Sequence, residues 1–357
     1  MADPETYMHR CLELAAFGAG HVAPNPMVGS VLVYEDRIIG EGYHEIHGKA
    51  HAEVNCIHSV AEADRHLIER STIYVSLEPC AHHGKTPPCA DLIIENRIPR
   101  AVVGCRDPFP LVNGKGIEKL EAAGIEVTLG VLEKECRQIN RRFFTFHTHH
   151  RPYIILKWAQ SANGFIARAA SDRLTPAGPM TAERTAISND YTNRLVHKWR
   201  SEEASILVGP RTALIDNPAL TTRLWTGLDP IRLVIDKKLE LPPDLRLLDG
   251  KAKTIVFNTI RHNPGANPGY YQIAEDSSLI HQLLIALHEL KIQSVMVEGG
   301  ARLLQSFIDE DAWDEARIII NNDLDLPAGL PAPRLTHAHL QSHESLLSDT
   351  IRYYHHD

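Results

Sequence analysis

Two cysteines lie close together in a proline-rich stretch, LEPCAHHGKTPPC, which runs from Leu77 to Cys89. Cys80 and Cys89 could form a disulfide, part of a closed zinc site, or part of an open catalytic metal site. The chain has 6 cysteines in 357 residues, far below the density of a disulfide scaffold. In a reducing compartment a close cysteine pair binds metal or does redox chemistry more often than it forms a bridge. The sequence therefore favours a metal site.

His51 and Glu53 supply the other groups that a catalytic zinc site needs, in the segment HAEV at the start of a predicted helix. One His and two Cys ligands leave the fourth tetrahedral position open for water, whereas a structural site closes all four. Zinc lowers the pKa of such a water towards neutrality, and a carboxylate such as Glu53 can carry its proton to a departing amine. The pieces HAE and PC match the zinc nucleobase deaminase signature, although eight residues here replace the usual two between the cysteines.

The neighbours of these residues receive more ordinary interpretations. His82 and His83 are expected to line the pocket or face solvent, and not to bind metal. The helix that begins at Cys89 is expected to favour the Cys89 thiolate, because free amides and the helix dipole stabilise negative charge. The four other thiols are expected to be buried and inert: Cys11, Cys56, Cys105 and Cys136. A structural zinc protein with a fourth protein ligand is the non-enzymatic alternative.

Composition excludes several classes of protein. The net charge of −8 argues against a strongly basic nucleic-acid-binding protein, although a local basic pocket for one phosphate remains compatible with it. The first residues lack an apolar signal core, and no stretch approaches the roughly 18 apolar residues of a membrane span. We therefore expect a cytoplasmic protein that acts on a small molecule, with no nucleic-acid or membrane partner.

The order of predicted helices and strands indicates two α/β domains with a boundary near residue 150, where a new pattern begins at Pro152. MVGSVLVYEDRIIGEGYH predicts a hairpin that turns at Glu35 and Asp36. Further strands are expected at 72–77, 100–105, 125–130, 153–157, 204–209, 231–237, 253–258, 294–300 and 315–321. Helices are expected at 5–18, 52–63, 89–98, 116–124, 192–202, 278–291 and 301–311. The tail, residues 326–357, is expected to mix loop with edge strands.

Several stretches together resemble the bifunctional deaminase/reductase family of riboflavin biosynthesis. In the first half they are APNPMVGSVLV, GEGYH, HAEV, LEPCAHHGKTPPC and DPFPLVNGKGIEKLEAAGIEV; in the second they are ILVGPRTALIDNPALTTR, IRLVID and VEGGARLL. The resemblance implies a cytidine-deaminase-like three-layer α/β/α domain in residues 1–150 and a dihydrofolate-reductase-like α/β domain in residues 151–357. It implies that the first domain removes, as ammonia, the 2-amino group of 2,5-diamino-6-(5-phosphoribosylamino)pyrimidin-4(3H)-one. The second domain would then use NADPH to reduce the ribosyl unit to ribityl.

The resemblance also implies site residues and partners. It implies that His51, Cys80 and Cys89 bind one Zn²⁺ per chain, that Glu53 is the proton shuttle, and that Asn25 contacts the pyrimidine. Expected substrate contacts in the second domain are Lys157, Arg200, Leu220, Arg223 and Glu298. Expected NADPH contacts are Thr212, Asp216, Gly299, Gly300 and Ala301, the last three at a helix start whose amides can approach phosphates. The substrate is a phosphorylated pyrimidine, and a homo-oligomer, dimer or tetramer, is expected.

Two positions in the second half depart from the family pattern. Asn163, in SANG, stands where the family usually has an aspartate, and Ala186, in TAISND, stands where it usually has a tryptophan. One alternative is therefore a deaminase whose second half no longer catalyses and serves in oligomerisation. Another is a zinc deaminase that acts on a different base, in a nucleoside or in tRNA.

Overall fold

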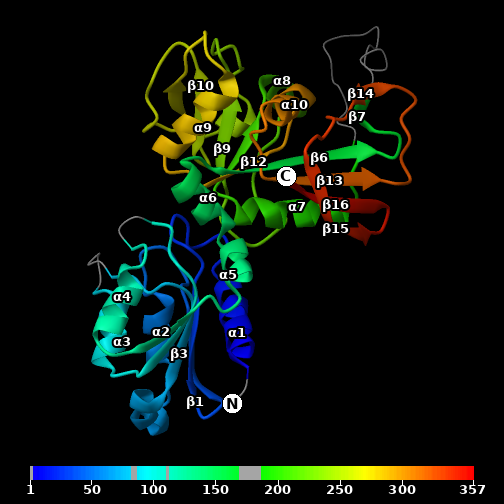
Figure 1. Cartoon of the computed structure of the whole chain (residues 1–357). Coiled ribbons are helices and arrows are strands. Elements are labelled where there is room, and N and C mark those ends of the chain that lie inside the picture. Colours follow the sequence, from blue (N-terminus) through cyan, green and yellow to red (C-terminus); the bar gives the residue numbers. More distant parts are fainter. Residues whose placement is uncertain (1–2, 82–86, 110–111, 169–185) are drawn as a thin grey trace. The chain divides into compact units, whose positions relative to one another are not determined.

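The structure is a computed structural model that describes residues 3–81, 87–109, 112–168 and 186–357. Its chain divides into two compact units, Met1–His150 and Arg151–Asp357, and Figure 1 shows the elements of each. None of the helices in these described ranges is long and apolar enough to cross a membrane. The predictions for His82 and His83 lie outside the described residues.

The first unit is built on a five-stranded sheet with the order β2-β1-β3-β4-β5. Its strands are β1 (Gly29–Tyr34), β2 (Arg37–Tyr43), β3 (Thr72–Leu77), β4 (Arg100–Cys105) and β5 (Glu126–Leu129). The predicted hairpin is confirmed, since β1 pairs antiparallel with β2 and both turn residues, Glu35 and Asp36, have positive φ. The pairs β3–β4 and β4–β5 are parallel, so the carboxyl ends of these three strands lie at one edge of the sheet.

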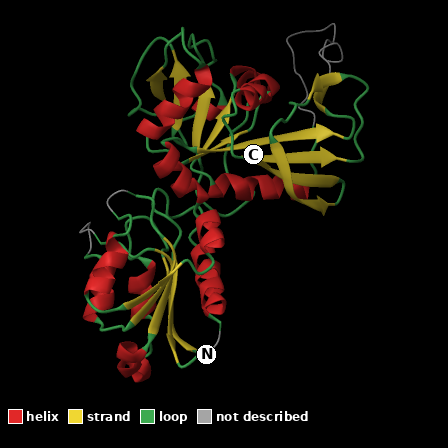
Figure 2. Ribbon diagram, viewed as in Figure 1, coloured by secondary structure: helices red, strands yellow, loops and turns green. Residues whose placement is uncertain are grey.

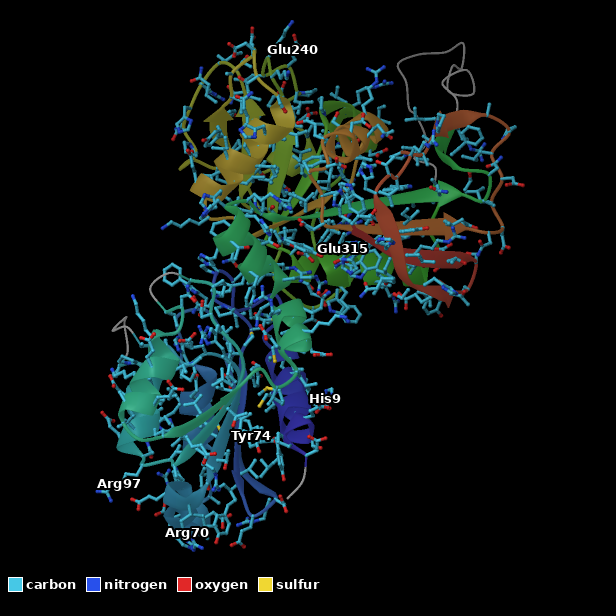
Figure 3. All side chains as sticks on the ribbon, in the orientation of Figure 1. His9, Arg70, Tyr74, Arg97, Glu240 and Glu315 are labelled. Atoms are coloured by element: carbon cyan, nitrogen blue, oxygen red, sulfur yellow. The ribbon has the colours of Figure 1, made fainter. Side chains whose placement is uncertain are left out.

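Helices cover both faces of this sheet, which confirms the three-layer α/β/α prediction (Figure 2). One face carries α1 (Pro4–Ala16), α5 (Glu133–Ile139) and α6 (Arg141–His149); the other carries α2 (Ala52–His58), α3 (Cys89–Glu95) and α4 (Lys115–Ala122), with a 3₁₀ helix at Glu62–Arg70. Strand alternation explains the two layers, because Val31 packs with α1 whereas Leu32 packs with α2. Tyr74 on β3, labelled in Figure 3, points toward α1, where its ring lies 5.0 Å from that of Tyr7.

The second unit contains a nine-stranded sheet with the order β11-β10-β9-β8-β12-β6-β13-β16-β15. Its strands are β6 (Tyr153–Ser161), β8 (Ser205–Val208), β9 (Ile231–Ile235), β10 (Thr254–Asn258), β11 (Gly269–Gln272), β12 (Ser294–Val297), β13 (Glu315–Asn321), β15 (Ala338–Leu346) and β16 (Asp349–His356). From β11 to β13 every pair is parallel, and β16 and β15 then join antiparallel.

Two buried apolar clusters pack on the opposite faces of this sheet. The helices are α7 (Asp190–Glu202), α8 (Pro210–Asp216), α9 (Leu279–Glu289) and α10 (Ala301–Asp309), with a 3₁₀ turn at Arg246–Leu248 and a separate ribbon of β7 (Phe165–Arg168) and β14 (Gly329–Pro331). The apolar residues of α9 and α10 join one cluster, whereas Val196 and Trp199 of α7 join the other. The α/β character predicted for this half is confirmed.

Two sequence predictions are wrong in detail. The helix expected over 52–63 ends at His58, and a 3₁₀ helix begins at Glu62. The tail does not supply edge strands alone, because β16 lies inside the sheet, between β13 and β15. The polar sequence of β16 hid this position: Ile351 is its buried apolar residue, and Tyr353 and Tyr354 are only partly buried against the two clusters.

Candidate functional site

Three potential metal ligands of the first unit meet, although His51 lies far from the two cysteines in the sequence. His51 precedes α2, Cys80 follows β3, and Cys89 begins α3. His51 Nδ1 lies 3.7 Å from Cys80 Sγ and 3.4 Å from Cys89 Sγ, and the three ligand atoms all lie within 4.8 Å of one another. One imidazole and two thiols at such separations form a donor set that suits Zn²⁺.

The amide at the start of α3 acts on Cys80, and not on Cys89 as the sequence suggested. The Cys89 N–H donates to Cys80 Sγ at 3.3 Å, and the Ala90 N–H donates to the Cys80 carbonyl oxygen at 3.1 Å. A hydrogen bond from the Cys89 thiol, followed by those from His51 and this amide, lowers the pKa of Cys80 despite its burial. The same interaction with Cys80, together with burial, raises the pKa of the Cys89 thiol. The expectation that the helix start favours the Cys89 thiolate stays a prediction for the metal-bound site.

Glu53 lies in the first turn of α2, two residues after His51, and is buried. Burial, with a further contribution from the negative charge of Cys80, raises the pKa of its carboxyl group to about 7. A carboxyl group with such a pKa can both accept and release a proton near neutral pH. This is the behaviour that a proton shuttle beside a metal-bound reactant requires.

Asn25 is connected to the metal ligands through a residue that the sequence analysis did not single out. The Asn25 side-chain nitrogen lies 3.1 Å from His44 Nε2, and His44 Nδ1 lies 2.9 Å from the Ala50 carbonyl oxygen. The His44 ring stands edge-on to that of His51, with 5.4 Å between their centroids. His44 thus links the turn that carries Asn25 to the start of α2, and the motif GEGYH was its signal in the sequence.

A second residue missed in the sequence is Glu78, which lies between β3 and Cys80 and is buried. Its carboxylate accepts hydrogen bonds from main-chain amides of the loop and helix start that follow β4. The donors are the N–H groups of Asp107 at 3.2 Å, Gly114 at 2.9 Å, Gly116 at 2.9 Å and Ile117 at 3.4 Å. Because only Pro79 separates Glu78 from Cys80, these bonds fix the chain just before a candidate ligand.

In the second unit, Glu298 and Arg200 form a buried ion pair. Glu298 directly follows β12, and its two carboxylate oxygens accept from Arg200 Nε at 2.8 Å and Nη2 at 2.7 Å. Arg200 also donates from Nη1 to the Thr221 carbonyl oxygen at 3.2 Å. Burial alone would raise the pKa of Glu298, but the charges of Arg200 and Lys157 lower it to about 2. Arg200 therefore holds an ionised Glu298 in addition to any contact it makes with substrate.

His197 lies one helical turn before Arg200 on α7 and is buried. Burial first, then the positive charges of Arg200 and Arg223, lower the pKa of His197 to about 4, so its ring is neutral at pH 7. Arg223 itself is exposed, and Lys157 is partly exposed on β6. Electrostatic interactions therefore connect four of the predicted substrate residues to one another or to His197. These residues are Lys157, Arg200, Arg223 and Glu298.

The predicted NADPH residues divide into a close group and one outlying position, Asp216. Gly299 and Gly300 precede α10, which begins at Ala301, and the Gly299 carbonyl accepts from the Gly209 N–H at 2.8 Å. A Cβ added at Gly300 would lie 3.2 Å from Thr212 Oγ1, so glycine keeps this approach open. Asp216 is exposed at the end of α8, and Leu220, a predicted substrate contact, is buried in the core cluster beside α7.

Asn163 uses both ends of its amide in the turn after β6. Its Nδ2 donates to the Leu326 carbonyl oxygen at 2.7 Å, and its Oδ1 accepts from the Leu326 N–H at 3.2 Å. An ionised aspartate could accept the second bond but could not donate the first. The departure from the family pattern is therefore accommodated by a main-chain contact. Ala186, the other departure, is exposed.

The fold and the two sites together define a class of protein, a zinc-dependent deaminase joined to a reductase. The zinc-binding region of cytidine and deoxycytidylate deaminases matches residues 1–105, and the RibD C-terminal domain matches residues 152–322. The riboflavin biosynthesis protein RibD of Aquifex aeolicus is 39% identical over 321 residues, which cover 88% of this chain and 86% of that protein. The chain belongs to the RibD family.

Solved structures support the same assignment over the whole length. A diaminohydroxyphosphoribosylaminopyrimidine deaminase/5-amino-6-(5-phosphoribosylamino)uracil reductase from Thermotoga maritima is 35% identical, with a TM-score of 0.86 and coverage of 99% of this chain and 98% of that one. A RibD of Acinetobacter baumannii is 30% identical, also with a TM-score of 0.86, and 98% of each chain is covered. The protein is a bifunctional enzyme, and its cofactors are Zn²⁺ and NADPH. The His and two Cys donors fit the metal, and the open glycine pair before α10 fits a phosphate-bearing cofactor.

Replacing Glu78 by glutamine is predicted to destabilise the first unit. The amide has one oxygen in place of two and adds donors that face the main-chain N–H groups, so amides now bonded to the second oxygen lose their acceptor. We expect a loss of about 1.5–3 kcal/mol in the free energy of unfolding for each such charged bond, together with weaker zinc retention, measured by denaturant unfolding and metal analysis. Glu118→Gln, on the exposed side of α4, is the matched control; equal zinc content and stability in both variants would contradict the role given to Glu78.

Proposed function

We propose that this chain deaminates 2,5-diamino-6-(5-phosphoribosylamino)pyrimidin-4(3H)-one at its 2-amino group and then reduces the ribosyl unit of the product to ribityl. The observation that carries the proposal is the meeting of His51, Cys80 and Cys89 beside a buried Glu53. In the second half of the chain, Glu298 directly follows a parallel strand, and its side chain is 9% exposed. We assign the first reaction to residues 1–150 and the second to residues 151–357, in agreement with the two compact units.

In the first reaction Glu53 moves protons. When bound, Zn²⁺ supplies a Lewis acid that makes water acidic enough to react near neutral pH. Glu53 accepts a proton from the attacking water and delivers it to the amino group that leaves as ammonia, which a pKa near 7 permits in both directions. Asn25, held by His44, offers an amide that can donate to and accept from the edge of the pyrimidine.

In the second reaction the residues of the second unit bind and orient the sugar phosphate. When bound, NADPH would supply a hydride to C1 of the ring-opened imine form of the ribosylamine, and the imine nitrogen would take a proton from solvent. Glu298, ionised and fixed by Arg200, is placed to accept hydrogen bonds from ribose hydroxyl groups, with Lys157 nearby as a donor. Arg223, which is exposed, is the better candidate for the phosphate, because the guanidinium of Arg200 already binds both oxygens of Glu298.

We also expect a homo-oligomer, dimer or tetramer, that acts in the cytoplasm. The resemblance to the family supports both expectations, and the six free thiols are compatible with a reducing compartment. Light scattering after size-exclusion chromatography measures the first directly.

Glu53→Gln is predicted to abolish ammonia release while leaving the metal in place. The amide cannot accept the proton, and general acid–base groups contribute about 10²–10⁴-fold in rate, so we expect a loss of at least about 10²-fold. Ammonia is measured with the diaminopyrimidine substrate, and zinc is measured on the same sample. Glu45→Gln, at an exposed position, is the control. Persistent ammonia release in Glu53→Gln with intact zinc would show that the assignment of Glu53 is wrong.

Glu298→Gln is predicted to impair reduction alone. The variant removes the charge that Arg200 and Lys157 face, so we expect NADPH oxidation with the deaminated intermediate to fall at least about tenfold. Ammonia release from the diaminopyrimidine should be unchanged, and Glu275→Gln, at an exposed position, should retain both activities. If the wild-type chain releases ammonia but never oxidises NADPH, the second unit is not a reductase and the alternative of an inactive module is supported.

A further inference from the structure

A second group of potential metal ligands lies in the second unit, and no role in either proposed reaction accounts for it. Asp311 follows α10, His337 precedes β15, and His356 is the last residue of β16. His337 Nδ1 lies 2.8 Å and His356 Nε2 3.3 Å from the same oxygen, Asp311 Oδ1. One ligand atom from each of these residues lies within 4.8 Å of the other two. The two imidazoles therefore converge on a single carboxylate.

The backbone holds the three side chains in these positions. Asp311 and His337 both have left-handed backbone conformations, with φ of 49° and 50°. The Asp311 N–H donates to the Ile308 carbonyl oxygen at 3.1 Å, which closes the end of α10, and the His356 N–H donates to the Asp314 carbonyl oxygen at 3.1 Å. Since all three segments are fixed before any ligand binds, little ordering entropy is lost on binding.

The surroundings of His356 also fit a metal ligand. Its Nδ1 lies 3.2 Å from the main-chain oxygen of Asp357, and its ring stands edge-on to that of the buried Trp313, with 4.8 Å between centroids. A ligating histidine commonly donates its other ring N–H to a main-chain oxygen in this way. A neutral imidazole has one N–H, and with that hydrogen on Nδ1 the lone pair of Nε2 is available to a cation.

We propose that Asp311, His337 and His356 bind a divalent transition-metal ion such as Zn²⁺, at a site separate from the deaminase zinc. Tetrahedral coordination at bond lengths of about 2.0–2.1 Å puts neighbouring ligand atoms about 3.3 Å apart. The His356–Asp311 distance of 3.3 Å has this length, whereas His337 and Asp311, at the hydrogen-bond distance of 2.8 Å, must move apart to admit an ion. Two imidazoles and one carboxylate suit Zn²⁺, Ni²⁺ or Cu²⁺, whereas Mg²⁺ and Ca²⁺ prefer oxygen alone. The ion keeps water ligands, because the His337 and Asp311 side chains are 62% and 52% exposed. It ties the end of α10 to the β15–β16 hairpin.

The test is calorimetric titration of full-length protein whose deaminase site is already loaded with zinc. Titration with ZnCl₂ should reveal one further ion per chain, which MgCl₂ does not displace. His337→Asn and Asp311→Asn each remove a ligand, and asparagine tolerates the left-handed backbone at both positions. We expect each variant to bind the further ion at least about tenfold more weakly. His343→Asn, at an exposed position on β15, should bind it like the wild type.

Thermal unfolding provides a second measurement, because an ion that binds only the folded chain raises its melting temperature. Added Zn²⁺ should raise the melting temperature of the wild type and of His343→Asn, and this rise should disappear in His337→Asn and Asp311→Asn. Absence of a further ion in the wild type would overturn the proposal. Equal binding by the wild type and both ligand variants would also overturn it, and would leave the cluster as a network of ion pairs. Neither result depends on catalysis at the two proposed active sites.

Discussion

Both units depend on one constraint, which is that a carboxylate buried at the end of a parallel strand must be given partners. Glu78 follows β3 and is buried, and Glu298 follows β12 with a side chain that is 9% exposed. An ionised carboxyl group removed from water without partners is too costly to keep. The segments around each strand end supply those partners, and the same segments carry residues of the candidate sites.

The two units meet this constraint with different partners, and the choice decides what each carboxylate can do. Main-chain amides surround Glu78, so the residue fixes a loop and leaves chemistry to Glu53 and the metal ligands. A single guanidinium binds Glu298, so the carboxylate stays ionised with its position set by Arg200. The first arrangement makes a rigid frame for metal ligands, and the second makes a charged group that a sugar hydroxyl can approach.

The sequence predicted the elements that local pattern controls. Apolar runs identified β3 and β4 to the residue, and the sequence singled out His51, Cys80 and Cys89 as candidate ligands, which the structure brings together. The roles of the individual site residues stay predictions. Partners far apart in the chain could not be foreseen: nothing near Arg200 indicates that it binds Glu298. The direction of the Cys89 N–H depends on the fold around it, so the sequence did not show that this N–H would donate to Cys80 Sγ.

The order of strands in the second unit has a consequence for how the chain folds during synthesis. β6 is the first strand of that unit to leave the ribosome, yet its neighbours β12 and β13 begin only at Ser294 and Glu315. Until they emerge, the apolar segment Tyr153–Leu156 has no strand on either side. Nascent chains with unpaired apolar strands are prone to aggregate. No strand of the first unit waits as long for its neighbours. We therefore expect the second half of the chain to depend more on chaperones than the first.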